Sequence, residues 1–282
     1  MKNLTVLTQN INGRINTNYS KNEEFALIKL EEILEKLYEE ERIRVDIISL
    51  TEVAKSVLKK LEEVKTLQLF NERYEIFTPL RCICKKGTCL SRNGTCILVR
   101  EEIQKEYIFV NNETELFGKY LKVKHDEKGC DLREVRISSQ SKNLEIVSCY
   151  VPTSNNIEAR EGILCSIFNE MNSLGEERKI YLGDFNFFVK DPTSERNYKL
   201  KEHRRILNES YKNDNNYIDE NLNASKKGKS IADIGYTHKN KKNNTVVDYI
   251  FTNLLVEKFI NKDYMTEKNM YDHTTLVSIV KG

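Results

Sequence analysis

Between Tyr74 and Tyr150 the sequence consists of short apolar runs, each followed by turn-forming or charged residues. The runs are YEIFTPL, GTCILV, YIFV, YLKV, EVRISS and LEIVSCYVP. Short segments that are rich in valine, isoleucine, phenylalanine and tyrosine and bounded by turn residues are typical of β-strands. Because turn residues separate the runs, this part of the chain is predicted to form antiparallel strands.

Amphipathic helical patterns lie on either side of this strand-rich part. Ser20 and Glu23 have the spacing of a capping box. Apolar residues then recur at helical spacing as far as Leu37, with glutamates on the opposite face, which is interpreted as a solvated face. Further helices are predicted over 56–69, 157–174 and 200–210.

Five more apolar runs are predicted to be strands. They cover 4–9, 45–50, 179–185, 245–252 and 274–280. Two strand-rich halves with helices outside them predict an α/β sandwich. The sequence contains no repeat, no linker rich in proline, glycine or serine, and no break in composition, so one domain over residues 1–282 is expected.

Composition limits the class of protein. A chain of 282 residues with 39% hydrophobic and 31% charged residues can bury a sizeable core, and a net charge of +2 excludes a highly charged disordered chain. The near-neutral balance argues against a protein that coats nucleic acid, although it allows a local basic patch. No apolar stretch is long enough to span a membrane and no signal-peptide pattern is present, so we expect a cytoplasmic protein with no membrane partner.

The seven cysteines are expected to be reduced thiols. Cys82, Cys84, Cys89 and Cys96 lie close together in CICKKGTCLSRNGTC, and four thiolates can hold Zn²⁺. Their spacing is not that of a usual zinc ribbon, and Cys96 falls in a predicted strand. A surface loop with incidental thiols is the favoured interpretation, and a zinc site is the alternative.

Polar residues interrupt or end several of the apolar strands. They are Asn10, Glu52, Tyr150, Asp184, Asn186, Asp248, Asp272 and His273. Each of them alone is commonly a cap, a turn residue or a satisfied hydrogen-bond partner. As a set they are informative, because ligands of α/β folds gather in the crevice at strand ends and because a buried acid needs a partner or a metal.

The segments that carry these residues form a recognisable series. TQNING, DIISLTEV, SCYVP, YLGDFN, VVDYIF and YDHTTLV resemble, in order, the motifs of the endonuclease/exonuclease/phosphatase superfamily, and most closely its exonuclease III-like branch. The resemblance extends over residues 4–280. GDFN alone is a weak signal, whereas GDFN followed by VDYIF and then by DH before a last strand is a strong one. The resemblance implies a DNase I-like fold, which is a four-layer α/β sandwich of two mainly antiparallel sheets with helices outside, together with a divalent metal and phosphoester hydrolysis.

The resemblance also implies a metal site. Glu52 matches the principal metal ligand of the family, Asn10 would assist it, and Asp272 would contribute. Mg²⁺ is commonly held by one or two carboxylates with water and substrate phosphate, so this small set is chemically sufficient. Mg²⁺ is therefore the expected cofactor, with Mn²⁺ as the alternative.

Catalytic roles follow from the same resemblance. Asp184 matches the residue that positions or deprotonates the attacking water, and Asn186 would hydrogen-bond the same region of the transition state. His273 matches the catalytic histidine, as a base or as a cationic phosphate clamp, and Asp248 matches the carboxylate that orients it. Tyr150 matches a tyrosine that contacts the phosphate or the leaving group.

The sequence departs from the exonuclease III-like pattern at two motif positions. Gln9 stands where that branch usually has tryptophan, and Thr153 stands where it usually has asparagine. The chain contains no tryptophan at all. A tryptophan-lined pocket for abasic sites is therefore absent, and dedicated abasic endonuclease activity is not expected.

Two lysine groups precede the predicted strand of Asp248. They are Lys226, Lys227 and Lys229, and Lys239, Lys241 and Lys242. Their place just ahead of a catalytic strand favours the rim of the crevice, where they would bind phosphates on either side of the cleaved one. Solvated loop charges are the alternative interpretation.

We therefore expect a Mg²⁺-dependent phosphodiesterase, a monomeric nuclease that hydrolyses DNA by attack of water on phosphorus. The alternative within the same fold is a phosphatase or phosphodiesterase for a lipid, inositol or nucleotide phosphoester. The alternative from another class is an inactive member that only binds nucleic acid or protein, and the full set of catalytic residues argues against it. The sequence leaves open the choice between endonuclease and exonuclease, between DNA and RNA, and between single and double strands.

Overall fold

The computed structural model describes the larger part of the chain. The described residues are 2–11, 23–79, 94–112, 133–151, 167, 170, 177–186, 218–219, 237–239, 244–245, 247–262, 264 and 273–281. The helix predicted over 200–210, the run YLKV, and Cys82, Cys84 and Cys89 lie outside this part of the chain. No helix among the described residues is long and apolar enough to cross a membrane.

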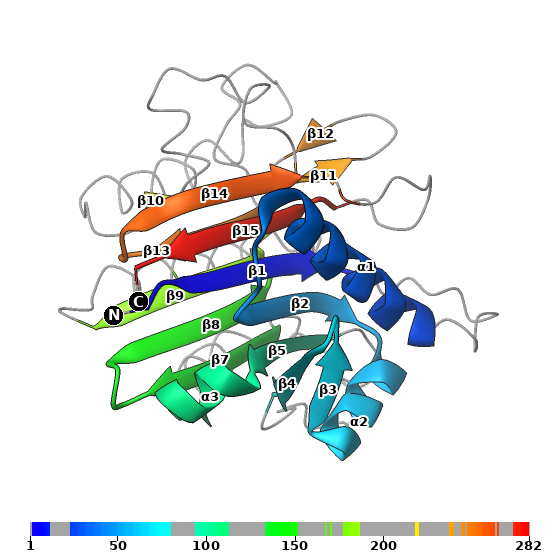
Figure 1. Ribbon diagram of the computed structural model, residues 1–282, viewed down its shortest axis with the longest axis horizontal. Helices are drawn as coiled ribbons and strands as arrows, with labels where there is room; N and C mark the ends of the chain where they lie inside the picture. The colour runs from blue at the N-terminus through cyan, green and yellow to red at the C-terminus, as the bar shows by residue number, and fades with distance from the viewer. Residues whose placement is uncertain are drawn as a thin grey trace, which may run out of the picture.

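The first half of the sandwich is a seven-stranded sheet (Figure 1). Across the sheet the strands are β14 (Val256–Lys262), β15 (Thr275–Val280), β1 (Leu4–Asn10), β2 (Ile47–Val53), β5 (Gly94–Arg100), β4 (Glu72–Phe77) and β3 (Thr66–Leu69). β1 and β2 are parallel, and every other neighbouring pair is antiparallel.

The second half is a six-stranded sheet. Its strands in order are β10 (Ile218–Asp219), β13 (Asp248–Thr252), β9 (Arg178–Asp184), β8 (Leu144–Tyr150), β7 (Arg133–Ser139) and β6 (Val110–Asn111). Only β8 and β9 are parallel. A small separate ribbon pairs β11 (His238–Lys239) with β12 (Asn244–Thr245).

Helices α1 (Glu23–Glu41) and α2 (Lys55–Val64) lie on the outer face of the seven-stranded sheet (Figure 1). Successive side chains of a strand point to opposite faces. The strands of this sheet therefore contribute apolar side chains both to the layer between the two sheets and to the layer beneath the helices. In β1, Leu4 and Val6 pack between the sheets, whereas Leu7 packs against the helices. A third helix, α3 (Glu101–Tyr107), places its buried Tyr107 in the layer between the sheets.

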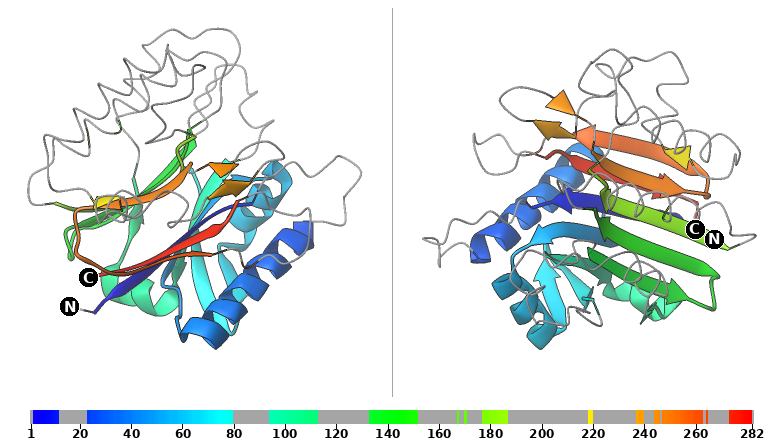
Figure 2. Two further views of the ribbon diagram at one scale, coloured as in Figure 1. Left: turned by 90° about the horizontal axis from the view of Figure 1, so that it is seen from above. Right: turned by 180° about the vertical axis from the view of Figure 1, so that it is seen from behind.

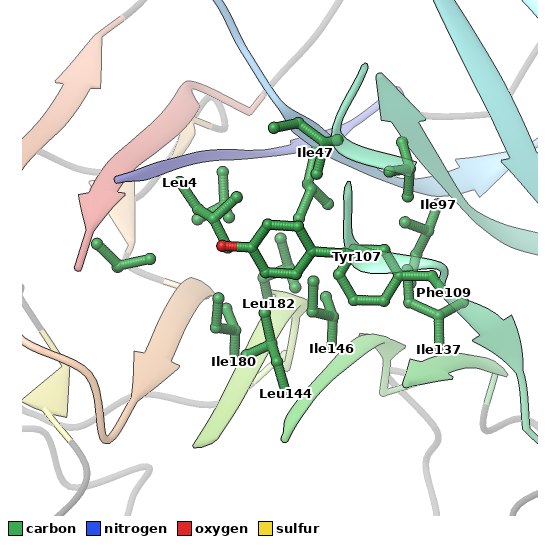
Figure 3. Packing of buried hydrophobic residues seen from close by; sticks show 14 of the residues in the cluster. Leu4, Ile47, Ile97, Tyr107, Phe109, Ile137, Leu144, Ile146, Ile180 and Leu182 are labelled. Atoms are coloured by element: carbon green, nitrogen blue, oxygen red, sulfur yellow. The ribbon is translucent and has the colours of Figure 1, made fainter. Parts of the chain in front are cut away.

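Figure 3 shows the layer between the two sheets. Leu4, Ile47 and Ile97 from the seven-stranded sheet face residues of the second sheet such as Ile146 and Leu182, and all five are fully buried. Residues at equivalent positions near the other end of the same strands are polar. The two predicted mainly antiparallel sheets packed face to face are therefore confirmed, and their shared layer turns from apolar to polar along its length.

The structure corrects the predicted helix over 56–69. α2 ends at Val64 because Lys65 adopts a left-handed conformation, with φ of 58°, and its N–H bonds to the carbonyl of Leu61. Residues 66–69 then form β3, which pairs with β4. The amphipathic pattern could not show this stop, since no glycine or proline marks it.

Three further segments differ from the sequence expectations. The run YIFV, predicted as a strand over 107–110, is divided between the end of α3 and the start of β6. β14 was not predicted, because its side chains are only partly buried and show no clear alternation. The strand predicted over 245–252 is interrupted, since β12 ends at Thr245 and β13 begins at Asp248.

Cys96 lies fully buried in β5, and burial raises the pKa of its thiol to about 12. A cysteine binds zinc as its thiolate. The placement of Cys96 therefore agrees with the prediction that it falls in a strand, and its burial weakens the zinc alternative.

Candidate active site

Three of the predicted residues lie in one row at the end of the six-stranded sheet. Asp184 is paired in register with Tyr150 on one side and with Asp248 on the other. Neighbouring strands are about 4.8 Å apart, so residues in register lie side by side. Asp184 lies two residues from Leu182, and Asp248 two residues from Ile250. Residues two apart share one face of a strand, and Leu182 and Ile250 are buried between the sheets, so both acids point toward the seven-stranded sheet.

Residues of the opposite sheet contact this row directly. Asn10, the last residue of β1, donates a hydrogen bond from Nδ2 to Asp184 Oδ2 at 2.8 Å. His273, just ahead of β15, has Nδ1 2.7 Å from Asp248 Oδ2. Both contacts join the two sheets at the same end of the sandwich. The chain ends lie at the other end, where Leu4 pairs with Val280 (Figure 1).

Asp184 is almost completely buried, with 1% of its surface exposed. Its Oδ1 accepts the backbone N–H of Asn186 at 2.9 Å, and its Oδ2 accepts the bond from Asn10. The pKa of Asp184 is nevertheless raised well above its ordinary value, first by burial and then by the neighbouring charge of Asp248, while His273 acts in the opposite direction. A nearby cation would favour the ionised carboxylate.

The backbone on both sides of Asp184 is unusual. Gly183 has φ of 139°, and a Cβ at this position would lie 2.0 Å from the carbonyl oxygen of Cys149. Asn186 has φ of 49°, a left-handed conformation that asparagine tolerates. Its side chain donates to the carbonyl of Val151 at 2.7 Å. Close approach of β8 and β9 at Gly183 and a sharp turn at Asn186 therefore present Asp184 at the strand end.

Glu52 lies at the same end of the seven-stranded sheet as Asn10. Asn10 is in register with Thr51, which precedes Glu52. The register of β2 against β5 shifts between Leu50 and Val53, and Glu52 inside this irregularity is half-buried with φ of 54°. Bulges redirect side chains and are common next to active sites. A non-glycine residue in a left-handed conformation costs free energy, and such residues cluster at functional sites.

A possible metal site is formed by Asp184, Asp248 and His273, whose ligand atoms lie within 4.8 Å of one another. Asp248 Oδ1 is buried and has no hydrogen-bond partner among the described residues. An orphaned carboxylate oxygen calls for a cation or water. Carboxylate and imidazole ligands suit a divalent ion, so the residues present fit such a group. This set differs from the predicted ligands Glu52 and Asn10.

The remaining predicted residues are only partly described. Tyr150 is half-buried at the end of the row. The main chain of Lys239 belongs to β11, directly after a residue that bridges to His273. The other predictions, namely Asp272, Lys226, Lys227, Lys229, Lys241 and Lys242, lie outside the described residues and stay untested.

Gln9 supports the site in a way that the sequence did not reveal. Its buried side-chain amide donates to the carbonyls of Asn10, at 2.9 Å, and His273, at 3.3 Å, and its oxygen accepts a bond from the Thr275 hydroxyl. One amide therefore links the end of β1 to the start of β15. The sequence feature that could have pointed to this role is that Gln9 stands where the exonuclease III-like motif usually has tryptophan.

Thr237 and His238 were also missed. Thr237 is fully buried, and His238 forms an antiparallel bridge with His273. The rings of the two histidines lie 4.7 Å apart at an angle of 50°. Figure 2 shows β11 and β12 at the end of the sandwich where β1 ends and β15 begins. These residues lie in a polar, lysine-rich part of the sequence, where no apolar pattern marked them.

Comparison with solved structures shows likeness over the whole chain. D. rerio TDP2 complexed with a single-strand DNA product matches with a TM-score of 0.58 and 13% identity, over 100% of both chains. The 3′ phosphatase NExo from Neisseria, bound to a product DNA hairpin, matches with a TM-score of 0.58 and 13% identity, over 99% of this chain and 100% of that chain.

A third structure carries the family description itself. The endonuclease/exonuclease/phosphatase from Bacteroides vulgatus matches with a TM-score of 0.57 and 12% identity, over 100% of this chain and 99% of that chain. No protein-family model matches the sequence, and no curated protein matches it. The likeness is therefore one of fold, and it agrees with the motif series read from the sequence. The chain has the DNase I-like α/β sandwich fold of the endonuclease/exonuclease/phosphatase superfamily.

Proposed function

We propose that the protein is a Mg²⁺-dependent phosphodiesterase that hydrolyses DNA. The observation that carries the proposal is the contact of two acids on one sheet with two residues of the other sheet. Asp184 is held by Asn10, and Asp248 is paired with His273 at 2.7 Å. A buried acid that shares a site with a histidine and has a strongly shifted pKa, as Asp184 has, is a candidate for catalysis.

Asp184 and Asp248 would hold the metal together with Glu52 at the neighbouring strand end. The metal would supply charge stabilisation for the phosphoryl oxygens. The donor set is rich in oxygen, which Mg²⁺ prefers. We keep Mn²⁺ as the alternative ion, because carboxylate and water ligands suit it as well.

Asp184 would orient the attacking water and accept its proton. Each of its two oxygens already accepts one hydrogen bond, from Asn10 or from the N–H of Asn186. These bonds fix the orientation of the carboxylate, so the lone pairs that are left to accept a proton from water point in a defined direction. Burial and Asp248 both raise the pKa of Asp184, which makes this carboxylate a stronger base than an exposed aspartate. Asn186 would support this arrangement through its own bond to Val151.

His273 would act on the phosphate through Nε2. Asp248 contacts Nδ1, so the acid sets the ring orientation and favours the protonated imidazolium. In that state the ring is a cationic partner for a phosphoryl oxygen or for the leaving group. Tyr150, at the other end of the row, would contact the same groups.

DNA is the proposed substrate, and two solved relatives in fold support it. D. rerio TDP2 is complexed with a single-strand DNA product, and Neisseria NExo with a product DNA hairpin. We further propose that the two predicted lysine groups bind flanking phosphates. If they do, duplex binding weakens with salt by a log–log slope near −0.9 per phosphate contacted. Replacing either group by glutamine should then flatten the slope by roughly one to three units.

The activity test uses plasmid DNA, a single-stranded oligonucleotide and p-nitrophenyl phosphate, each with Mg²⁺ or EDTA. We expect DNA cleavage with Mg²⁺, none with EDTA, and a loss of at least ~100-fold in Asp184→Asn. Glu134→Gln is the matched control, because Glu134 is equally buried but lies on the outer face of the six-stranded sheet. Hydrolysis of p-nitrophenyl phosphate alone would favour the phosphatase alternative, and full DNA cleavage in EDTA would exclude the metal mechanism.

A further inference from the structure

Thr237 is bonded to both strands that carry the Asp248–His273 pair. Its Oγ1 accepts the backbone N–H groups of Val247, at 2.9 Å, and of Asp248, at 3.0 Å. Its carbonyl accepts the backbone N–H of Thr274 at 2.7 Å. Thr237 is fully buried, so each of these bonds is shielded from water.

The two strands belong to different sheets. Asp248 begins β13 of the six-stranded sheet, and His273 lies two residues before the start of β15 of the seven-stranded sheet. Among the described residues, no strand pairing joins one sheet to the other. The 2.7 Å contact between Asp248 and His273 therefore depends on links that cross between the sheets, and Thr237 is such a link at this position.

His238, which follows Thr237, strengthens the link to His273. His238 forms a backbone bridge with His273, and the rings of the two residues are 4.7 Å apart. The main chain of His273 is also held by Gln9, through its carbonyl. The histidine is thus fixed from two directions. The start of β13 is held within its own sheet by the N–H of Phe185, which bonds to the Val247 carbonyl at 2.9 Å. The N–H groups of Val247 and Asp248 both bond to the Thr237 hydroxyl, which ties this end of the strand to the His273 side.

We propose that Thr237 is a positioning residue that sets the separation of Asp248 and His273 across the two sheets. The proposal rests on the proposed function of that pair. Loss of the hydroxyl would leave two buried N–H groups without their acceptor and would break this link between the start of β13 and the segment of His273. The acid would then no longer meet Nδ1 of His273 at hydrogen-bond distance, and a misplacement of about 1 Å can cost roughly 100-fold in rate.

The test compares Thr237→Val with Thr237→Ser and with a matched control. Valine keeps the shape and removes the acceptor, while serine keeps the acceptor. The control is Thr252→Val at the far end of β13, where a fully buried hydroxyl donates to the carbonyl of Lys179 at 2.8 Å and accepts the N–H of Leu254 at 3.1 Å. Thr237→Val and Thr252→Val each remove two buried hydrogen bonds, but only Thr237 is tied to the Asp248–His273 pair.

We expect kcat on DNA to fall about 10- to 100-fold in Thr237→Val, with KM within about twofold of wild type. Thr237→Ser should restore kcat to within about threefold, and Thr252→Val should keep wild-type kcat despite a similar loss of thermal stability. A wild-type kcat in Thr237→Val, or an equal loss in Thr252→Val, would overturn the proposal.

A second readout needs no substrate. The Nδ1–H proton of His273, hydrogen-bonded to a carboxylate, is followed by NMR in metal-free protein and assigned with His273→Ala. The signal should persist in wild type, Thr237→Ser and Thr252→Val, and should move or vanish in Thr237→Val. An unchanged signal in Thr237→Val contradicts the positioning role of Thr237 even if wild type cleaves no substrate. The positioning role and the proposed phosphodiesterase function are therefore tested independently. If Thr237→Val does not fold, Thr237→Ala is judged by the same two measurements.

Discussion

A buried ionic cluster on the outer face of the six-stranded sheet predicts an unusual dependence of stability on pH. Arg136 contacts Glu134 at 2.9 Å, Glu145 at 3.1 Å and also Glu170, and Lys179 contacts Glu145 at 2.6 Å. Glu134 is the most deeply buried of the acids, and burial raises its pKa from 4.5 to about 6 even though Arg136 opposes the change. Replacing it with glutamine removes the charge and keeps the shape.

The sign and size of the effect follow from this pKa. The folded state binds more protons than the unfolded state between pH 4.5 and about 6, so the wild type loses stability as the pH rises through this window. A shift of about 1.5 units corresponds to roughly 2 kcal/mol, of which about 1 kcal/mol falls between pH 5 and 8. Glu134→Gln has no carboxylate to titrate at this position. Its unfolding free energy should therefore rise relative to that of wild type by about 1 kcal/mol between pH 5 and 8.

The assay is urea unfolding of wild type and Glu134→Gln at pH 5, 6, 7 and 8. Glu62→Gln, at an exposed position on α2, is the control and should follow wild type at every pH. A difference between Glu134→Gln and wild type that stays constant with pH would refute the reasoning. A difference that favours wild type increasingly at high pH would show that the attraction to Arg136 outweighs the cost of burial.

Three further predictions concern the site. Gly183→Ala should destabilise the protein by about 3 kcal/mol or more, measured by thermal unfolding, because the new Cβ would lie 2.0 Å from the Cys149 carbonyl oxygen at a φ of 139°; a melting temperature close to that of wild type would contradict this. Asp248→Asn and His273→Ala should each lower kcat, and the double variant should be little worse than the poorer single one, because the two residues act as a unit; fully additive losses would separate their roles. Mg²⁺ should raise the melting temperature of wild type but not of Asp184→Asn, and an equal rise in both proteins would place the ion elsewhere.

Much of the site could be predicted because its residues carry a local signal. Asp184 and Asp248 interrupt apolar strands, and polar residues in such positions need partners to be buried. Asn10 and His273 stand next to strands whose apolar patterns are clear, and the structure brings both of them to these acids. Most of the buried strands were predictable because burial of a sheet face imposes apolar residues along its length, whereas the partly buried β14 and the short β3 were missed.

The sequence by itself determined the two-sheet sandwich and the residue types available at its polar end. Tertiary structure decided which of these residues meet. Thr237 and Gln9 act through buried hydrogen bonds to the main chain of residues far away in the sequence, and such bonds leave no periodic pattern. The row of Tyr150, Asp184 and Asp248 likewise depends on strand register. Register is set by packing across the whole sheet, because a slip of one residue would turn every side chain to the opposite face.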